Sequence, residues 1–406
     1  MKKTLAAVAV LGAFAGSALA ADVQLYGIVD TGVGYNHVDM DSLDGVSLYN
    51  DGKAVYSFAD SDSFSMMSGQ ASGSRWGLKG TEDLGNGLTV GFILEDGFTS
   101  DNGADSAPMF NRESSLFVQG GFGKFAMGRM GSLNNGQSSW AKVGMVSAFG
   151  TSDWGGYSAQ LGNIFSLAGQ WDNMVAYETP SFAGFKVYAQ YAMGSNDNEN
   201  ESSSDRYYAI GATYNNGPFA GYFAVDSINY QTSGAKIDDK FIDDSLTVTL
   251  GGSWDFEVAK VYFGAQYFDE VKLSSIGGIT KTTVSGVDLS KLGGPDITVG
   301  ALLKVKGYGI SLTADAPVAG GKAMFGVGYV DAEAADSTQD FLKDKNVDAD
   351  LDLKRYVVSV GYDYPFSKRT DVYAIASYMQ DQVDAGTSED WDPSAYTLYV
   401  GLRHRF

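Results

Sequence analysis

Apolar and polar residues alternate along most of this chain. In residues 74–96, "SRWGLKGTEDLGNGLTVGFILED", one set of alternating positions is mainly apolar and holds Trp76, Leu78, Leu88, Val90, Phe92 and Leu94. The positions between them include Arg75, Lys79, Thr81, Thr89 and Glu95. A period of two residues is typical of a β-strand with one apolar and one polar face. The pattern therefore predicts two strands joined by the Gly- and Asn-containing turn 82–87.

The same alternation continues to the end of the chain, with clear examples at 185–191, 246–254, 355–363 and 396–406. Short connections rich in Gly, Asn or Pro are expected at 82–87, 120–124, 179–184, 215–218, 255–258, 316–321 and 365–370. Long connections are expected near 38–70, 99–110, 131–170, 193–205, 231–243, 271–300, 332–352 and 382–394. Because short and long connections alternate, the sequence predicts sixteen strands. Segment 271–300 leaves an alternative open, since "TKTTVSGVDL" could form an additional hairpin.

An even number of strands, with short turns at one rim and long loops at the other, is typical of transmembrane β-barrels. Strands of about 9–11 residues suit a tilted crossing of a lipid bilayer, and closure of the barrel leaves no unpaired strand edge in lipid. We therefore predict an all-β fold, an antiparallel transmembrane barrel whose apolar face contacts lipid and whose polar face lines a lumen. A large soluble β-protein would also show alternation, but it would not explain the rhythm of the connections.

The amino terminus supports export from the cytoplasm. Lys2 and Lys3 precede the apolar stretch 5–15, and "GSALA" follows before Ala21. A basic start, a short apolar region and an exit of small residues are typical of a secretory signal peptide. We expect residues 1–20 to be removed and residues 21–406 to form the barrel.

Composition and charge exclude several functions. The chain has no cysteine, so disulfides and Cys-ligated metals are impossible. The formal net charge of −21 argues against binding to nucleic acid, whose phosphates require a basic surface. Segments 38–62, 195–205, 331–352 and 381–392 hold 23 of the 49 acidic residues, so the acid is concentrated in the long connections.

Motifs for cofactors, metals or catalysis are absent from the sequence. "GGFGK" at 120–124 lacks the spacing of a phosphate-binding loop. The aspartates at 348, 350 and 352 begin like an EF-hand, but Leu353 and Ser359 occupy positions that require Gly and Glu. The only histidines, His37 and His404, lie near opposite ends of the chain. We expect no cofactor, no metal site and no enzymatic activity.

Six segments in order resemble a known family. They are "ADVQLYGIVDTGVGY", "SRWGLKGTEDLGNGLTVGFILE", "FNRESSLFVQGGFGKFAMGR", "DNMVAYETPSFAGFKVYAQY", "YDYPFSKRTDVYAIASY" and "VGLRHRF". They resemble the general diffusion porins of Gram-negative outer membranes, especially the β-proteobacterial and neisserial branch. The resemblance implies a homotrimer in the outer membrane, in contact with its lipid and lipopolysaccharide, and passive diffusion of small hydrophilic solutes and ions. It also implies that Phe406 is the terminal signal recognised by the barrel assembly machinery.

The resemblance further implies that the third long loop, about 131–170, folds into the lumen and narrows the pore. Arg75 and Arg129 match basic wall residues of the family, which face acidic residues on this loop. The loop of this chain carries a single carboxylate, Asp153, which is therefore the expected acidic partner. Many relatives have a basic residue just before "DN" at 172–173, where this chain has Gln170 and Trp171.

Two further residues are expected at the constriction from their place in the alternating pattern. Lys79 lies on the same face as Arg75, four residues along the strand, and Glu95 falls on the polar face of its strand. The constriction residues predicted from the sequence are therefore Arg75, Lys79, Glu95, Arg129 and Asp153.

A sixteen-stranded barrel leaves an aqueous channel. Acidic loops around one mouth would concentrate cations, so the sequence predicts a mild cation preference. A substrate-selective channel, or an adhesin that acts through its loops, remains an alternative function for the same barrel.

Overall fold

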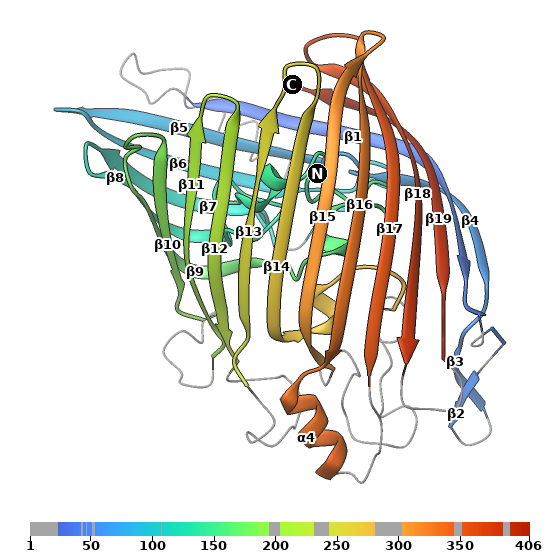
Figure 1. The fold of residues 1–406 in the computed structure, drawn as a ribbon. Helices are drawn as coiled ribbons and strands as arrows, with labels where there is room; N and C mark the ends of the chain where they lie inside the picture. Colours follow the sequence, from blue (N-terminus) through green and yellow to red (C-terminus); the bar gives the residue numbers. More distant parts are fainter. Residues whose placement is uncertain are drawn as a thin grey trace, which may run out of the picture.

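The wall of the molecule is one continuous antiparallel sheet (Figure 1). The computed structural model describes residues 23–41, 44–45, 47–50, 53–106, 108–194, 204–230, 243–280, 303–344, 351–384 and 390–406. The expected signal peptide, the expected extra hairpin and the aspartates at 348 and 350 lie outside the described residues, except that Thr280 at the start of the hairpin is described.

The wall strands are β1 (Gln24–Asp39), β4 (Ser61–Ser68), β5 (Arg75–Gly85), β6 (Leu88–Gly97), β7 (Glu113–Gly120), β8 (Gly123–Gly131), β9 (Gln170–Glu178), β10 (Phe185–Ala192), β11 (Arg206–Asn216), β12 (Phe219–Asn229), β13 (Leu246–Asp255), β14 (Lys260–Lys272), β15 (Lys304–Val318), β16 (Gly321–Ala334), β17 (Asp352–Pro365), β18 (Thr370–Asp384) and β19 (Ser394–Arg405). Both β4 and β5 pair with β1, so they are two halves of one spanning strand that is interrupted at 69–74. Sixteen spanning positions result, and the pairing of β1 with β19 closes the barrel. The predicted strand number is confirmed.

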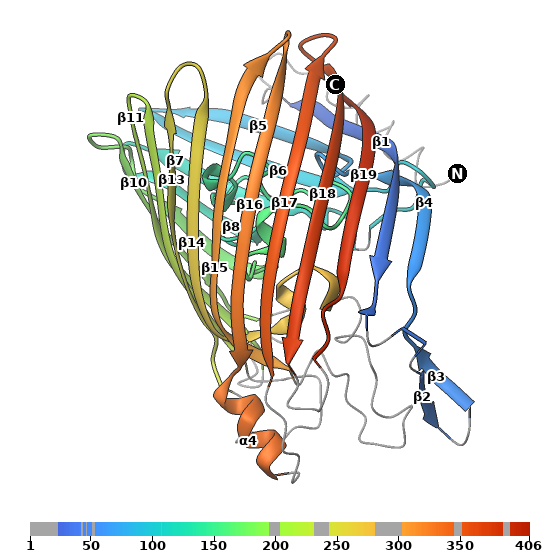
Figure 2. The same ribbon diagram turned by 45° about the vertical axis from the view of Figure 1, so that its right-hand side comes forward.

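The two rims of the barrel differ in the length of their connections, as the sequence predicts. Turns such as 86–87, 121–122 and 319–320 join strands at one end, which we call the turn end. The opposite loop end carries the small hairpin β2 (Ser47–Asn50) and β3 (Lys53–Ser57) and helix α4 (Asp336–Asp344). Figure 2 shows these elements beyond the ends of the spanning strands.

Alternation along each strand separates an apolar outside from an inside that is covered by protein. On β15, Leu312 is 48% exposed on the outer face, whereas its neighbours Ser311 and Thr313 are 0% and 1% exposed. The interior of the barrel therefore holds the packed core, and the exterior presents an apolar band.

None of the helices in the described residues is long and apolar enough to cross a membrane.

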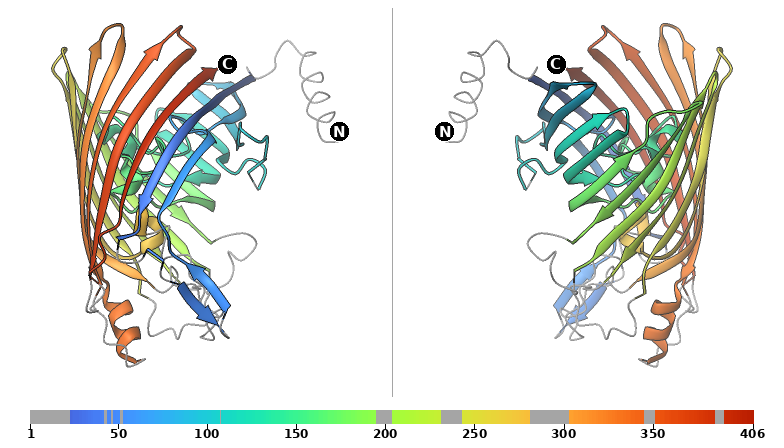
Figure 3. Two further views of the ribbon diagram at one scale, coloured as in Figure 1. Left: turned by 90° about the vertical axis from the view of Figure 1, so that its right-hand side faces the viewer. Right: turned by 90° about the vertical axis from the view of Figure 1, so that its left-hand side faces the viewer.

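The core inside the barrel comes from the long connection 132–169, which includes the short helices η3 (Val143–Val146) and η4 (Leu161–Asn163). A second segment, 273–280, begins with η6 (Leu273–Ser275) and also lies inside, with Leu273, Ile276 and Ile279 buried. Figure 3 shows both within the curve of the wall. The wall is lowest over β7–β10, whose strands have 8 or 9 residues, against 14 or 15 in β15–β18.

The outward orientation of the apolar face can be tested by one substitution in the middle of β15. We expect Leu312→Arg to lower the free energy of unfolding from lipid vesicles by about 2–4 kcal/mol, because the charge would enter the hydrocarbon layer. Gln119→Arg is the control, since Gln119 is exposed on the lumenal face of β7. Equal effects of the two substitutions on urea unfolding would contradict the assigned orientation.

Candidate functional site: a narrowed passage along one wall

Glycines in the wall make room for the connection 132–169, which we call the inner loop. A Cβ atom at Gly309 of β15 would lie 2.0 Å from the carbonyl oxygen of Ile164. A Cβ atom at Gly264 of β14 would lie 2.9 Å from the side chain of Val146. The wall on the β13–β16 side therefore allows close approach of the loop, and the loop fills that half of the lumen.

A buried ion pair fixes the inner loop to the tall side of the wall. Arg355 and Asp381 are both 0% exposed, and their side chains form two hydrogen bonds of 2.6 and 2.7 Å. The Arg355 guanidinium also donates to the carbonyl oxygen of Asn163 in the inner loop at 3.0 Å. Asp381 accepts from the backbone N–H of Thr280 at 3.0 Å, so segment 273–280 is held by the same pair.

The spanning strand made of β4 and β5 contacts the inner loop where it is interrupted. In segment 69–74, the backbone N–H of Ser72 donates to the buried carboxylate of Asp30 at 2.7 Å. The carbonyl oxygen of Gln70 accepts from the backbone N–H of Trp154, at the tip of the inner loop, at 2.8 Å. The interrupted strand therefore touches the inner loop.

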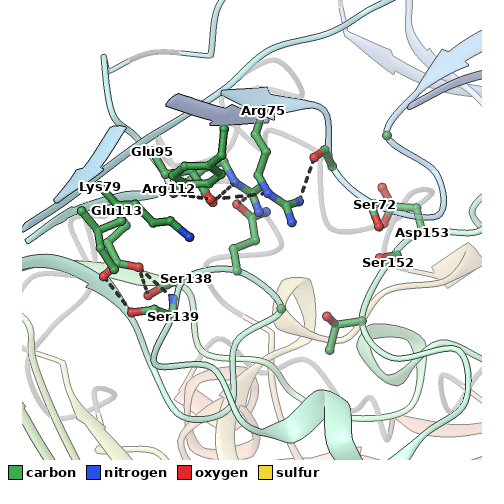
Figure 4. A pocket seen from close by; sticks show the side chains of 17 residues that line it. Ser72, Arg75, Lys79, Glu95, Arg112, Glu113, Ser138, Ser139, Ser152 and Asp153 are labelled. Carbon is green, nitrogen blue, oxygen red and sulfur yellow. Dashed lines mark hydrogen bonds and ion pairs between the residues drawn. The ribbon is translucent and has the colours of Figure 1, made fainter. Parts of the chain in front are cut away.

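A cavity of about 500 Å³ remains between the inner loop and the wall strands β1, β5, β6 and β7. Arg75, Lys79 and Glu95 line it from the wall. Ser138, Ser139, Ser152 and Asp153 line it from the loop, and Figure 4 shows them around this space. We call this cavity the slot.

Glu95 is the centre of the charged network on the wall of the slot. Its carboxylate accepts from Nε of Arg112 at 2.7 Å and from the hydroxyl of Tyr26 at 3.0 Å, and lies 3.4 Å from Nε of Arg75. Arg75 donates further to the carbonyl oxygen of Gly73 at 3.0 Å. The two arginines therefore share one carboxylate and are held against the wall.

Glu113, which is only 1% exposed, attaches the inner loop to the start of β7. Its carboxylate accepts from the hydroxyl of Ser138 at 2.9 Å and from the backbone N–H of Ser139 at 2.7 Å (Figure 4). Burial lowers the pKa of Lys142, further along the loop, and the carboxylate of Glu178 opposes this shift. Glu113 thus ties the inner loop to the wall beside the slot.

Comparison with known proteins identifies the family. Residues 6–384 match the family model described as Gram-negative porin. The chain belongs to this porin family. It is 34% identical to an outer membrane porin protein of Bordetella pertussis and 28% identical to "Major outer membrane protein P.IB" of Neisseria gonorrhoeae, in both cases over the whole of both chains. Its fold resembles the solved "Anion-selective porin from Comamonas acidovorans", with a TM-score of 0.63 and 24% identity over 95% of this chain and 100% of that one.

The porin is therefore a channel protein of the outer membrane through which small hydrophilic solutes diffuse passively, and it is not an enzyme. The turn end of the barrel corresponds to the periplasmic side and the loop end to the outside of the cell.

The structure brings four of the five predicted constriction residues to the slot: Arg75, Lys79, Glu95 and Asp153. Arg129 is not among the residues that line it. Arg129 pairs in register with Ser114, the neighbour of lumenal Glu113, and so faces outward, where it binds the carbonyl oxygen of Asn111 at 2.8 Å and the carboxylate of Asp172. The parity of its strand indicates the same, since Phe125 and Met127 on its face are exposed.

Two charged residues that line the slot, Arg112 and Glu113, were not among those predicted from the sequence. Both lie in the segment "FNRESSLFVQGG" that carries the family resemblance. The parity of Glu113 with Ser115, opposite to that of outward Leu116, places it on the lumenal face. Arg112 precedes the strand, so alternation alone does not orient its side chain.

The buried ion pair of Arg355 and Asp381 should be essential for the position of the inner loop inside the barrel. We expect Arg355→Gln to leave the Asp381 charge buried without its partner, at a cost of about 3–5 kcal/mol. The variant should show larger open-channel current fluctuations in planar bilayers and faster proteolysis within the inner loop. Lys306→Gln is the control, because it breaks a partly exposed ion pair with Asp336. Identical current noise in the Arg355 variant and the unmodified porin would contradict this role.

Proposed function

We propose that the slot is the narrowest part of a general diffusion pathway and that its lining sets the size limit for solutes. The observation that supports this proposal is that the inner loop and the interrupted strand leave a polar cavity beside β1, β5, β6 and β7 in the described part of the chain. Serines on the loop side and charged groups on the wall side can solvate a hydrophilic solute without binding it tightly.

The pairing of the charges supports general diffusion over recognition of one substrate. A specific site needs polar groups that converge on the ligand. In the slot, Glu95 is engaged by Arg75, Arg112 and Tyr26, and Glu113 by the loop serines. These groups stabilise the walls of the passage.

A bulky side chain in the slot should restrict diffusion. We expect Ser152→Trp to lower single-channel conductance and to slow the swelling of liposomes most strongly for the largest sugars. Ser181→Trp is the matched control, because Ser181 is exposed in the turn between β9 and β10.

Three outcomes of the swelling assay would count against the proposal. Equal inhibition by the two tryptophans would place the narrowest point elsewhere. Saturable uptake of a single solute would indicate a substrate-selective channel. No swelling with any solute would favour an adhesive role for the loops.

We also propose that the porin is a homotrimer whose subunits meet along the low wall at β7–β10. The outward pair of Arg129 and Asp172 supports this contact, because a charged pair would be costly in lipid but not against another subunit. Lipopolysaccharide would contact the remaining outer face and the acidic loops.

Phe406 is proposed as the signal for the barrel assembly machinery and also joins the ends of the wall. Its backbone exchanges hydrogen bonds of 3.2 and 3.1 Å with Gly27. We expect native mass spectrometry of the extracted porin to show three chains that each begin at Ala21, with bound lipopolysaccharide. Removal of Phe406 should lower the yield of this complex in the outer membrane. A monomer, or an unchanged yield without Phe406, would contradict the respective proposal.

A further inference from the structure

Segment 273–280 is a second part of the chain that folds into the lumen, next to the inner loop. It follows β14 directly, and its side chains Leu273, Ile276 and Ile279 are each 1% exposed. Figure 2 shows it in yellow, between the inner loop and α4 at the loop end. The segment is therefore part of the packed core and covers the inner loop from the loop end.

Hydrogen bonds join this segment to the part of the inner loop that begins at η4. The backbone N–H of Gly277 donates to the carbonyl oxygen of Gly162 at 2.6 Å, and the N–H of Leu167 donates to that of Ser275 at 3.4 Å. The side-chain hydroxyls of Ser166 and Ser275 lie 2.7 Å apart. The two segments therefore contact each other through their backbones as well as through side chains.

Two adjacent glycines allow the segment to come this close. Gly278 has a φ of +95°, and a Cβ atom at this position would overlap the guanidinium of Arg355. The guanidinium is held in place, because it is fully buried and forms two hydrogen bonds to Asp381. A Cβ atom at Gly277 would overlap the side-chain oxygen of Asn163 in the inner loop. A larger residue at either glycine would therefore push the segment away from the loop.

The inner loop is thus held from two sides. At its tip, the backbone N–H groups of Trp154 and Gly155 donate to Gln70 of the interrupted strand at 2.8 and 2.7 Å. Segment 273–280 holds the part near η4 on the tall side of the wall. Since the slot lies between the inner loop and β1, β5, β6 and β7, its width depends on how far the loop is drawn toward the tall side.

We infer that segment 273–280 is a second determinant of the size limit for hydrophilic solutes, and that Gly277 and Gly278 are its positioning residues. The segment keeps the inner loop against the tall side and so keeps the slot open. When the segment is displaced, the loop loses these hydrogen bonds and can move into the cavity of about 500 Å³ on its other side. The inference deepens the proposed function, because it requires that solutes pass through the slot.

The test is Gly278→Val, measured by single-channel recording in planar bilayers and by the swelling of liposomes with sugars of graded size. We expect brief closures to replace the steady open level, and swelling to slow most strongly for the largest sugars. Gly320→Val is the matched control. Gly320 also has a positive φ, +82°, but it lies in the turn between β15 and β16, so this variant should conduct like the unmodified porin.

A milder variant tests the same segment without a change at the glycines. The hydroxyl of Thr280 donates to the carboxylate of Asp381 at 2.6 Å. Thr280→Val removes this hydrogen bond at nearly constant volume and leaves the pair of Arg355 and Asp381 intact. We expect the same closures at a lower frequency, and this result decides the question even if Gly278→Val does not fold.

An engineered disulfide provides the reverse test, since the chain has no cysteine of its own. Ser166→Cys/Ser275→Cys would join the segment to the inner loop at the contact between the two hydroxyls. When this disulfide is formed in the Thr280→Val variant, the steady open level should return. Reduction with dithiothreitol should bring the closures back.

The activity of Ser152→Trp separates failure of this inference from failure of the proposed function. If Ser152→Trp restricts diffusion but Gly278→Val and Thr280→Val conduct like the unmodified porin, the inference is overturned alone. Closures that persist with the disulfide formed would also overturn it, because separation of the segment from the loop could not cause them. If Ser152→Trp has no effect, the slot is not the diffusion pathway, and the inference fails with it.

Discussion

The requirement that every backbone N–H and C=O in lipid be hydrogen-bonded determines the rest of this structure. An open sheet would expose two edges to hydrocarbon, and the pairing of β1 with β19 removes both. The hydrogen bonds between Gly27 and Phe406 extend this seam to the last residue of the chain. Closure also explains why the start of β1 and the end of β19 lie next to each other in the wall at the turn end.

Closure of sixteen strands creates an interior that is too wide to be filled by wall side chains alone. The porin fills it with the inner loop and segment 273–280, which form an apolar core against glycine-rich strands. Because the inner loop packs against one side of the wall only, a passage remains beside β5–β8. The buried pair of Arg355 and Asp381 holds two separate chain segments at once, and so couples the position of the loop to the tall side of the wall.

Electrostatics along the passage depends on which charges are compensated locally. A net charge of −21 describes the whole chain, but ions inside the slot experience the groups within a few ångströms. There, Glu95 and Glu113 mainly stabilise the arginines and the loop, whereas Lys79 and Lys124 rest on aromatic rings. The net charge of the chain therefore does not describe the slot, where three cations (Arg75, Lys79, Arg112) are matched in number by three carboxylates (Glu95, Glu113, Asp153).

The sequence by itself determined the strands, their number, the two kinds of rim and the outward face, because these follow from the period of two and from local turn chemistry. The same parity places Arg75, Lys79 and Glu95 on the lumenal face and Arg129 on the outer face, whereas family likeness alone implies a lumenal position for Arg129. Only the tertiary structure decided which side of the lumen the inner loop fills and that Arg112 joins Glu95. These facts depend on contacts between segments far apart in the chain, such as Arg355 with Asn163, and no local pattern encodes them.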